Sequence, residues 1–222
     1  MTISYCIPVC NEVEELDTLL WWLSPFVSID DEIIVQVDSS KDTEPIYEVL
    51  EKFPPTTVIQ YRFDGNFADL KNNLISNATK QYICLIDADE LPALELLGNL
   101  KGLLEENPEV ELFNVPRFNV VKGLTEEWKS RWGWRTTTRT INGEIVRLYD
   151  SPHQVQLVNL PDYQSRIFKN EGWISWSGKV HERLVGYNTF VNLPFETFDF
   201  GFWHVKEIER QIKQNELYDN IA

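Results

Sequence analysis

Two hydrophobic periods alternate along the first half of the chain. One is the short apolar run typical of a buried strand, and the other is a repeat of apolar residues three and four positions apart, typical of a helix with one buried face. The strand-like runs are residues 3–9, 32–37, 57–61 and 82–86. The helix-like segments are the stretch after Asn11, residues 43–53 and residues 67–78. The pattern predicts strands and helices in alternation.

The connections between these strands predict how they pair. Strands joined by helical crossovers are parallel and buried on both faces, and open sheets of this kind bind ligands beyond the carboxyl ends of their strands. We therefore expect residues 82–86 to be buried, and the residues that follow each run to converge on one site. The converging residues are 8–12, 38–42, 64–66 and 87–90.

The second half of the chain, from about residue 112, has a different pattern. Its Trp- and Arg-rich sequence carries short strand-like pieces without clear crossover helices, which indicates a mixed α+β region. A charged run from His204 onwards predicts a surface helix. Because no repeat or Gly/Ser-rich linker divides the chain, we expect one domain over 1–222, with halves 1–110 and 111–222. The strand-like pieces are LFNVPRF, EIVRLY, SRIFK and VHERLV.

The amino-acid composition limits the binding partners and the cellular compartment that we expect for this chain. The chain has 35 Asp and Glu against 20 Lys and Arg, a formal charge of −15, which repels nucleic acid and anionic lipid unless a local basic site offsets it. No apolar run approaches the roughly 20 residues of a membrane span, and the first residues lack the features of a signal peptide. Cys6, Cys10 and Cys84 lack metal-ligand spacing and are expected to be reduced core thiols. We expect a soluble, cytoplasmic protein.

The run at residues 82–86 is followed at once by carboxylates. Side chains two residues apart on an extended chain point the same way, so Asp87 and Asp89 can face one ligand. Their oxygens suit Mg²⁺ or Mn²⁺, which complete their coordination with water and substrate phosphates. The alternative is a solvated turn before a helix that Pro92 opens. Glu90 is expected either to lie behind the metal-binding residues or to cap that helix, and we favour the structural role of a cap.

Five segments in a fixed order resemble one enzyme family. They are YCIPVCNEVEEL, VQVDSSKDTEP, FDGNFADLKNNLISNATKQYICLIDADE, SGKVHERL and FWHV. Together they resemble glycosyltransferase family 2, whose members have the GT-A fold, and in particular its bacterial and phage members. The resemblance covers residues 3–110 well and 165–215 loosely, and it leaves 112–164 unmatched.

The resemblance implies an α/β fold of the GT-A type, with a mostly parallel, Rossmann-like central sheet flanked by helices and a mixed α+β acceptor half. It also implies a metal-dependent, inverting transfer of a sugar from a nucleotide-diphosphate sugar, with a UDP-sugar as the expected donor and Mn²⁺ or Mg²⁺ as the ion. Asp87 then lies near the ribose and the metal, Asp89 ligates the ion, and Glu182 is the catalytic base. The residues implied to line the donor site are Pro8, Asn11, Glu12, Asp38, Lys71, Asp87 and Gly178.

The roles that the resemblance implies for two of these residues have alternatives. Glu182 can instead be an exposed strand residue paired with Arg183. Lys71 stands with Asn72 where the family has Arg-Asn, a position that implies a contact with the nucleotide base or the diphosphate. Lysine lacks the planar fork with which arginine binds such groups, which weakens this role.

The chain has three histidines. A histidine ligand suits Mn²⁺ better than Mg²⁺, and the resemblance places His204 of FWHV as the third metal ligand beside Asp87 and Asp89. His181, next to Glu182, is the competing ligand. His153 is expected to be a loop residue.

The unmatched middle of the chain contains a basic and aromatic patch, WKSRWGWRTTTRT. Indole rings stack on sugars or bases and guanidinium groups bind phosphate, so the patch is a candidate acceptor site. A structural flap whose arginines lie along the surface is the alternative. The acceptor itself is unknown, and a saccharide, a protein or a modified nucleobase each fits. The patch residues are Trp128, Lys129, Arg131, Trp132, Trp134, Arg135 and Arg139.

Two other functions are compatible with the same residues. A nucleotidyltransferase also combines an α/β sheet with a carboxylate-bound metal, although the segment IPVCNEVEE lacks the Gly-rich, basic signature of that class. The second alternative is a catalytically inert module that binds a sugar-nucleotide or a carbohydrate. The presence of Asp87, Asp89 and Glu182 together favours an enzyme over such a module.

Overall fold

The computed structural model of the chain describes residues 1–141 and 154–221. Its first half has the predicted alternation of strands and helices, and each predicted strand agrees with the structure to within one residue at either end. A short 3-10 helix, η1 (Ser24–Phe26), follows α1. The elements are β1 (Ile3–Val9), α1 (Val13–Leu23), β2 (Glu32–Asp38), α2 (Glu44–Lys52), β3 (Thr57–Tyr61), α3 (Phe67–Ile75) and β4 (Tyr82–Leu85).

The second half contains longer strands than the sequence pattern indicated. β6 has 11 residues and β8 has 16, so LFNVPRF and SRIFK are parts of long strands and not separate short ones. The elements are β5 (Glu90–Pro92), α4 (Leu94–Glu106), β6 (Leu112–Lys122), α5 (Glu126–Trp132), β7 (Thr136–Thr140), β8 (Gln154–Lys169), β9 (Ser175–Ser177), β10 (Arg183–Val185), β11 (Phe190–Asn192), β12 (Phe202–Glu207) and α7 (Ile208–Ile221).

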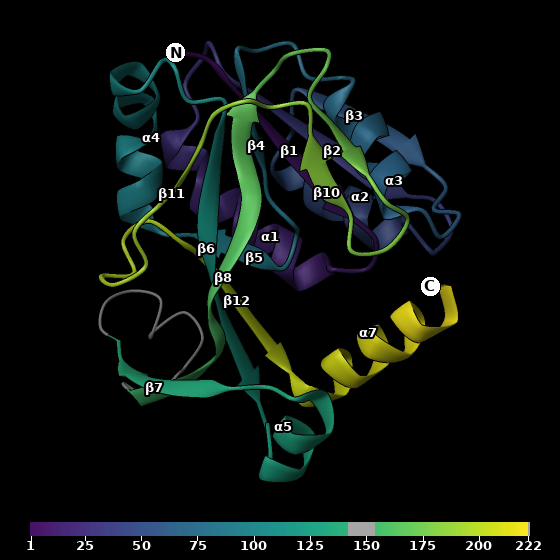
Figure 1. Cartoon of the computed structure of the whole chain (residues 1–222). Coiled ribbons are helices and arrows are strands. Elements are labelled where there is room, and N and C mark those ends of the chain that lie inside the picture. Colours follow the sequence, from purple (N-terminus) through teal and green to yellow (C-terminus); the bar gives the residue numbers. More distant parts are fainter. Residues whose placement is uncertain (142–153, 222) are drawn as a thin grey trace.

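One large sheet organises the molecule, with the strand order β3-β2-β1-β4-β8-β6-β12-β5. The four strands of the first half are parallel, as predicted from their helical crossovers. β8 is inserted antiparallel between β4 and β6, and β12 lies parallel to β6 on its other side. Figure 1 shows β6, β8 and β12 continuing below the helix-flanked body, where α5 and α7 lie. The predicted fold, a central and largely parallel sheet flanked by helices, is confirmed.

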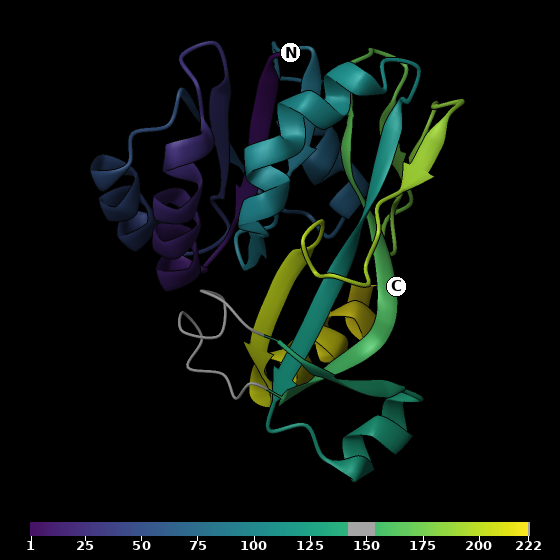
Figure 2. The same ribbon diagram turned by 90° about the vertical axis from the view of Figure 1, so that its left-hand side faces the viewer.

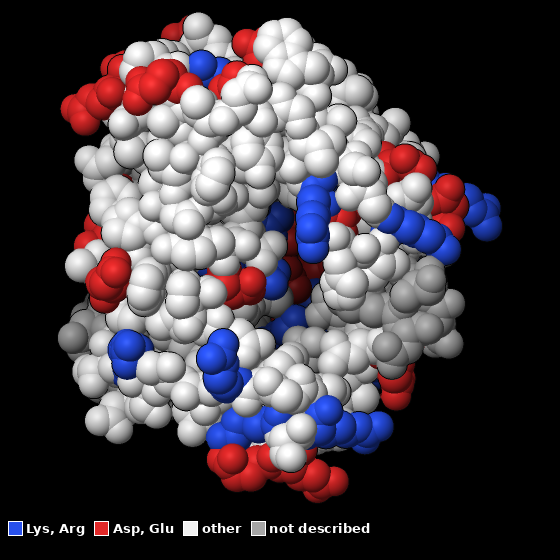
Figure 3. Space-filling model, viewed as in Figure 1, with Lys and Arg blue, Asp and Glu red and all other residues white. Residues whose placement is uncertain are grey.

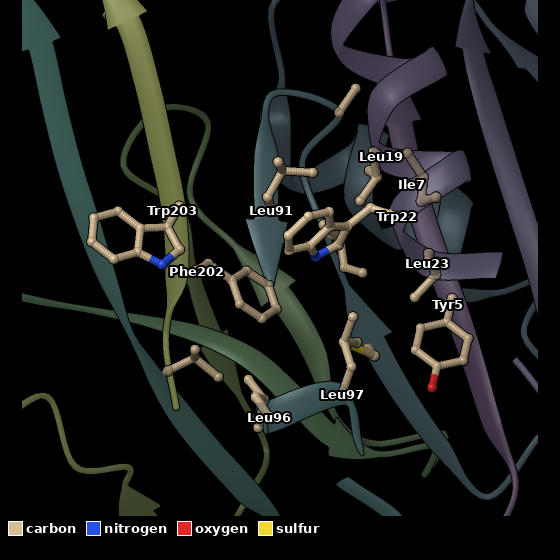
Figure 4. Close-up of a cluster of buried hydrophobic side chains, with 14 of the residues drawn as sticks. Tyr5, Ile7, Leu19, Trp22, Leu23, Leu91, Leu96, Leu97, Phe202 and Trp203 are labelled. Carbon is tan, nitrogen blue, oxygen red and sulfur yellow. The ribbon is translucent and has the colours of Figure 1, made fainter. Parts of the chain in front are cut away.

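The two faces of the sheet pack against different helices. Tyr5 and Ile7 of β1 pack with α1, α2 and α4, whereas Cys6, between them, packs with α3 and the β9–β10 hairpin. Figure 2 shows α1, α2 and α4 together on one side. Figure 4 shows the core where α1 and α4 meet β5 and β12, and there the indole Nε1 of Trp22 donates to Pro92 O at 2.8 Å. The residues from Tyr82 to Ile86 are all buried, as predicted.

The ends of two predicted helices differ from the structure. Residues 202–207 form β12, between β6 and β5, so His204 lies on a strand and the last helix begins only at Ile208. Pro92 is likewise part of β5, and α4 begins at Leu94. Glu90 is therefore not the cap of that helix.

A further helix, α5, was not predicted in the middle segment. Thr125 caps it by accepting a hydrogen bond from the backbone N–H of Trp128, and Gly133 ends it with a left-handed backbone, φ 65°. Both are ordinary helix-end signals, which the Trp- and Arg-rich composition obscured. The predicted strand EIVRLY lies outside the described residues.

Two expectations from composition concern the cysteines and the membrane. All three cysteines are free, and Cys6 and Cys84 are buried in the core, where burial raises the pKa of Cys84 to about 12. Burial also raises the pKa of Cys10 to about 12, with a further contribution from Asp38, so none of these thiols is activated. Among the residues described, no helix combines the length and the apolar character needed to cross a membrane.

Gly201 permits a close approach between the segment before β12 and β6. A Cβ atom at this position would overlap the ring of Phe118 and lie 2.6 Å from Pro116 O, and the Phe118 ring is confined by Phe198 and Trp203, each with its ring centroid 5.0 Å away. We expect Gly201→Ala to lower the free energy of unfolding by about 1–3 kcal/mol, measured by urea denaturation. Gly102→Ala, with open space around it in α4, is the control and should stabilise by roughly 0.5–1 kcal/mol.

Candidate functional site

The carboxyl ends of β1, β2 and β4 bring several predicted residues to one edge of the sheet. Glu12 follows β1, Asp38 ends β2, and Asp87 and Asp89 follow β4. β12 carries His204 to the same edge, where its Nε2 lies 3.3 Å from Asp89 Oδ2. Figure 3 shows acidic and basic side chains close together in a hollow near the centre of this face of the molecule.

A chain of hydrogen bonds fixes the ring of His204. Asn119 Nδ2 donates to Asp162 Oδ2 at 2.8 Å, and Asn119 Oδ1 lies 2.8 Å from His204 Nδ1. Because an ionised carboxylate only accepts hydrogen bonds, the amide of Asn119 has one orientation, and Nδ1 of His204 must be the donor to it. A neutral His204 then turns its Nε2 lone pair towards Asp89. Metal-binding histidines are oriented in this way.

The pair formed by Asp89 and His204 fits a divalent cation. Two ligands at right angles on an ion, each about 2.1 Å away, lie roughly 3 Å apart, close to the 3.3 Å between Asp89 Oδ2 and His204 Nε2. Within residues 1–141 and 154–221, no set of three or more His, Cys, Asp or Glu side chains is arranged to hold a metal. An ion at this pair would take its further ligands from water and phosphate, as Mg²⁺ and Mn²⁺ do.

Arg210, on α7, brings a positive charge to the same carboxylate. Its Nη2 lies 3.5 Å from Asp89 Oδ2 and 2.9 Å from Glu12 Oε1, and its Nη1 contacts Glu15. Burial alone would raise the pKa of Asp89, but a protonated His204, which would donate from Nε2, and Arg210 outweigh it and hold that pKa well below its usual range. A cavity of about 350 Å³ adjoins Asp89, lined by residues of α1, β12 and α7. Its volume is within the range of small-molecule sites.

Asp87 has a different partner. Arg166 of β8 is 2% exposed, and its Nη2 lies 2.5 Å from both Asp87 Oδ2 and the buried Glu90 Oε1. Burial alone would raise the pKa of Asp87, but Arg166, with help from Lys71, lowers it to about 2. Burial raises the pKa of Glu90, and the charge of Asp87 raises it further. Glu90 thus lies behind the site in a structural contact, and one arginine holds the loop that carries Asp89.

The loop after β1 is held by one of its own carboxylates. Glu12 Oε2 accepts hydrogen bonds from the backbone N–H groups of Cys10 and Asn11, at 2.8 and 3.0 Å. The other oxygen accepts from Arg210, so Glu12 joins this loop to α7. Pro8 is partly buried in β1 and Asn11 is exposed. The predicted contacts of Pro8, Asn11 and Glu12 with the nucleotide stay predictions.

Asp38 is buried and organises the turn after β2. Its Oδ1 accepts from the backbone N–H groups of Ser40, at 2.9 Å, and Phe63, at 3.1 Å, and its Oδ2 accepts from Ser40 Oγ at 2.8 Å. Burial alone would raise the pKa of Asp38, but these hydrogen bonds lower it. Its predicted contact with the nucleotide base or ribose stays a prediction.

Glu182 and Lys71 contact each other. Lys71 Nζ lies 2.5 Å from Glu182 Oε1, so the acid pairs with Lys71 and not with Arg183. Glu182 does not belong to a strand over VHERLV, because β10 begins at Arg183 and His181 has a left-handed backbone, φ 56°. Gly178, at φ 102°, lies in the same loop, and a Cβ there would lie 3.5 Å from Glu182 Cα. His181 is exposed, and His204 is the histidine that lies beside Asp89.

The tryptophans of the middle segment pack on one another. The ring centroids of Trp128 and Trp132 are 4.7 Å apart, those of Trp132 and Trp134 are 4.6 Å apart, and the three cover a small apolar cluster of β6, β8 and α7. Packing of the indole faces favours the structural interpretation of this patch, whereas Arg135 and Arg139 are exposed. The predicted loop residue His153 lies outside the described residues.

Four residues beside the site were not foreseen, and all of them come from the second half of the chain. Arg166 and Arg210 contact the acidic residues directly, and Asn119 orients His204. Burial lowers the pKa of Lys206 to about 8, against the opposing charge of Asp89. Among these four residues, only Arg166 could have been noticed from the local sequence, because it is a charged residue within the apolar strand segment SRIFK.

Comparisons with known proteins agree with the fold. The family model described as Glycosyl transferase family 2 matches residues 4–157. TarS from S. aureus is similar in structure, with a TM-score of 0.58, 16% identity, and coverage of 92% of this chain and 37% of that chain. TarS residues 1–349 in complex with UDP-GlcNAc give a TM-score of 0.58 and 15% identity over 93% of this chain and 59% of that chain. The chain thus spans less than two thirds of the length of these structures. No match was found among curated proteins.

Proposed function

The chain belongs to glycosyl transferase family 2, and on that premise we propose that it transfers a sugar, with inversion and with a divalent cation, from a nucleotide-diphosphate sugar to an acceptor nucleophile. The observation that carries this proposal is the pair Asp89 and His204 at the carboxyl ends of the strands. TarS, which has the same fold, has been crystallised with UDP and with UDP-GlcNAc. A UDP-sugar is therefore the proposed donor.

We assign the donor to residues 1–110 and the acceptor to residues 111–222. Pro8, Asn11 and Asp38 would lie along the nucleotide, with Asp87 towards the ribose, because these residues end the parallel strands. The two halves share the diphosphate position, since His204 and Arg210 reach Asp89 from β12 and α7. Asp89 and His204 would hold the cation, Mn²⁺ or Mg²⁺, whose positive charge would stabilise the diphosphate as the leaving group. The acceptor stays unidentified.

Glu182 is the proposed base. An attacking hydroxyl must lose its proton as its oxygen bonds to the anomeric carbon and the bond from that carbon to the diphosphate breaks. The Glu182 carboxylate, in the loop beside Gly178, would accept this proton. Attack from the face opposite the leaving group inverts the configuration of the anomeric carbon.

A donor screen tests the proposal. UDP-, GDP-, dTDP- and CMP-sugars are added to the protein with and without Mn²⁺, and both thermal unfolding and nucleoside diphosphate release are recorded. A ligand that binds the native state raises its apparent stability, so we expect a UDP-sugar to raise the melting temperature with Mn²⁺ and to release UDP. Glu182→Gln should keep the thermal shift but lose at least ~100-fold in UDP release, within the range for loss of a general base.

The same screen separates the alternatives. Release of pyrophosphate would identify a nucleotidyltransferase. A thermal shift without transfer or hydrolysis would favour an inert binding module. Retained anomeric configuration in the product, determined by NMR, would overturn the inverting mechanism.

A further inference from the structure

The contact between Lys71 and Glu182 joins residues that are 111 positions apart in the chain. The distance between Lys71 Nζ and Glu182 Oε1 is 2.5 Å, and the two side chains are only 11% and 15% exposed. On its other side, Lys71 Nζ lies 4.5 Å from the centre of the Trp176 ring. The ammonium group is thus held between a carboxylate and an aromatic face, both of which attract a cation.

The helix that carries Lys71 is fixed to the segment that carries Glu182. The backbone N–H of Phe67, in the first turn of α3, donates to Lys179 O at 3.0 Å. One turn further, Asn72 Nδ2 donates to Trp176 O at 2.9 Å, and Asn72 Oδ1 accepts from Trp176 N at 2.8 Å. Because α3 also packs on the central sheet, these bonds give the loop from Gly178 to Glu182 a rigid support.

The loop itself needs such support. Gly178 and His181 have positive φ angles, 102° and 56°, and a non-glycine residue keeps such a backbone only where its surroundings hold it. An unsupported carboxylate at Glu182 would sample several positions. A base is effective only when its oxygen is held within hydrogen-bond reach of the proton that it removes.

We propose that Lys71 is a positioning residue for the base Glu182, and that its main role is not contact with the nucleotide. This inference rests on the proposed glycosyl transfer. Lys71 occupies Oε1 of Glu182, so Oε2 is the oxygen that accepts the proton of the acceptor hydroxyl. The acceptor oxygen then bonds to the anomeric carbon, and the bond from that carbon to the diphosphate oxygen breaks with its electron pair passing to the diphosphate.

Lys71→Met tests the proposal, because it removes the ammonium group and keeps an apolar chain against Trp176. We expect kcat for UDP release from the donor found in the screen to fall roughly 10- to 100-fold, the effect of misplacing a reacting group by about 1 Å. The affinity for UDP with Mn²⁺, measured by titration calorimetry, should stay unchanged. Lys71→Arg should recover part of kcat. Lys52→Met, which breaks an exposed ion pair with Asp17, is the matched control and should change neither quantity.

A double-mutant cycle gives the deciding result. In the Glu182→Gln background, Lys71→Met should cause no further loss of kcat, since residues that act as one unit are not additive. The proposal is overturned if Lys71→Met weakens UDP binding at unchanged kcat, or if it lowers kcat by the same factor in the wild type and in the Glu182→Gln background. If the wild-type protein transfers no sugar, the proposed function fails and this inference fails with it. If the wild type is active and Lys71→Met has the same kcat, this inference alone is contradicted and the proposed function stands.

Discussion

Asp89→Asn is expected to weaken Mn²⁺ binding and to lower sugar transfer by at least ~100-fold each, because a charged ligand contributes several kcal/mol and each 1.36 kcal/mol is a factor of ten. Asp89 presents its Oδ2 to His204 Nε2 at 3.3 Å, and the amide that replaces it has the same shape but no charge. Titration of free Mn²⁺ by electron paramagnetic resonance measures the binding directly. Release of UDP measures the transfer.

The controls for Asp89→Asn separate metal binding from folding. His204→Ala should also weaken Mn²⁺ binding, whereas Asp17→Asn, at an exposed ion pair with Lys52, should not. The pKa of Asp89 is lowered in the folded protein, so its carboxylate contributes stability that is present above its unfolded pKa of about 3.9 and is lost at more acidic pH. The variant should lack this contribution. Unchanged Mn²⁺ affinity in Asp89→Asn would contradict the metal assignment.

The residues of the first half could be predicted because they follow local rules. Parallel strands end at one edge of the sheet, so the residues after β1, β2 and β4 had to meet there once the strands were recognised. Asp87, Asp89 and Glu12 are of this kind. The buried run of residues 82–86 fixes the two aspartates because it lies between β1 and β8 in the sheet.

The partners of these residues could not be predicted, because they depend on long-range pairing. Arg166 meets Asp87 only since β8 is inserted antiparallel between β4 and β6, and 79 positions separate the two residues. Asn119 orients His204 across the parallel pair β6 and β12. The family resemblance indicated the position of Lys71 but not its partner Glu182. That contact depends on how the β9–β10 hairpin lies on α3. Periodicity within one segment carries no information about such contacts.

Arg166→Met is expected to have the largest effect on stability, a loss of about 3–5 kcal/mol in the free energy of unfolding at pH 7, because breaking a buried ion pair leaves a charge without its partner. The Nη2 of Arg166 serves Asp87 and Glu90 together, and Glu90 is 1% exposed. In a chain of this length, each kcal/mol of lost stability lowers the melting temperature by about 2–4 °C. The melting temperature of Arg166→Met should therefore fall by roughly 6–20 °C. Urea denaturation and thermal unfolding measure the two quantities. Arg139→Met, at an exposed position of β7, is the control and should change both of them little.

The dependence on pH shows whether charge or packing causes this loss. The pKa of Asp87 is lowered to about 2 in the folded protein. The Asp87 carboxylate therefore stabilises the fold at pH values above the pKa of Asp87 in the unfolded chain, and this stabilisation is lost as the pH falls through about 2. Glu90 has a raised pKa from burial and from Asp87, and without Arg166 its ionisation should cost still more as the pH rises. The difference between wild type and Arg166→Met should therefore shrink from neutral pH towards pH 2. Adding Glu90→Gln to Arg166→Met should recover part of the stability at pH 7, since one buried carboxylate then remains. A difference that is constant with pH would assign the loss to packing.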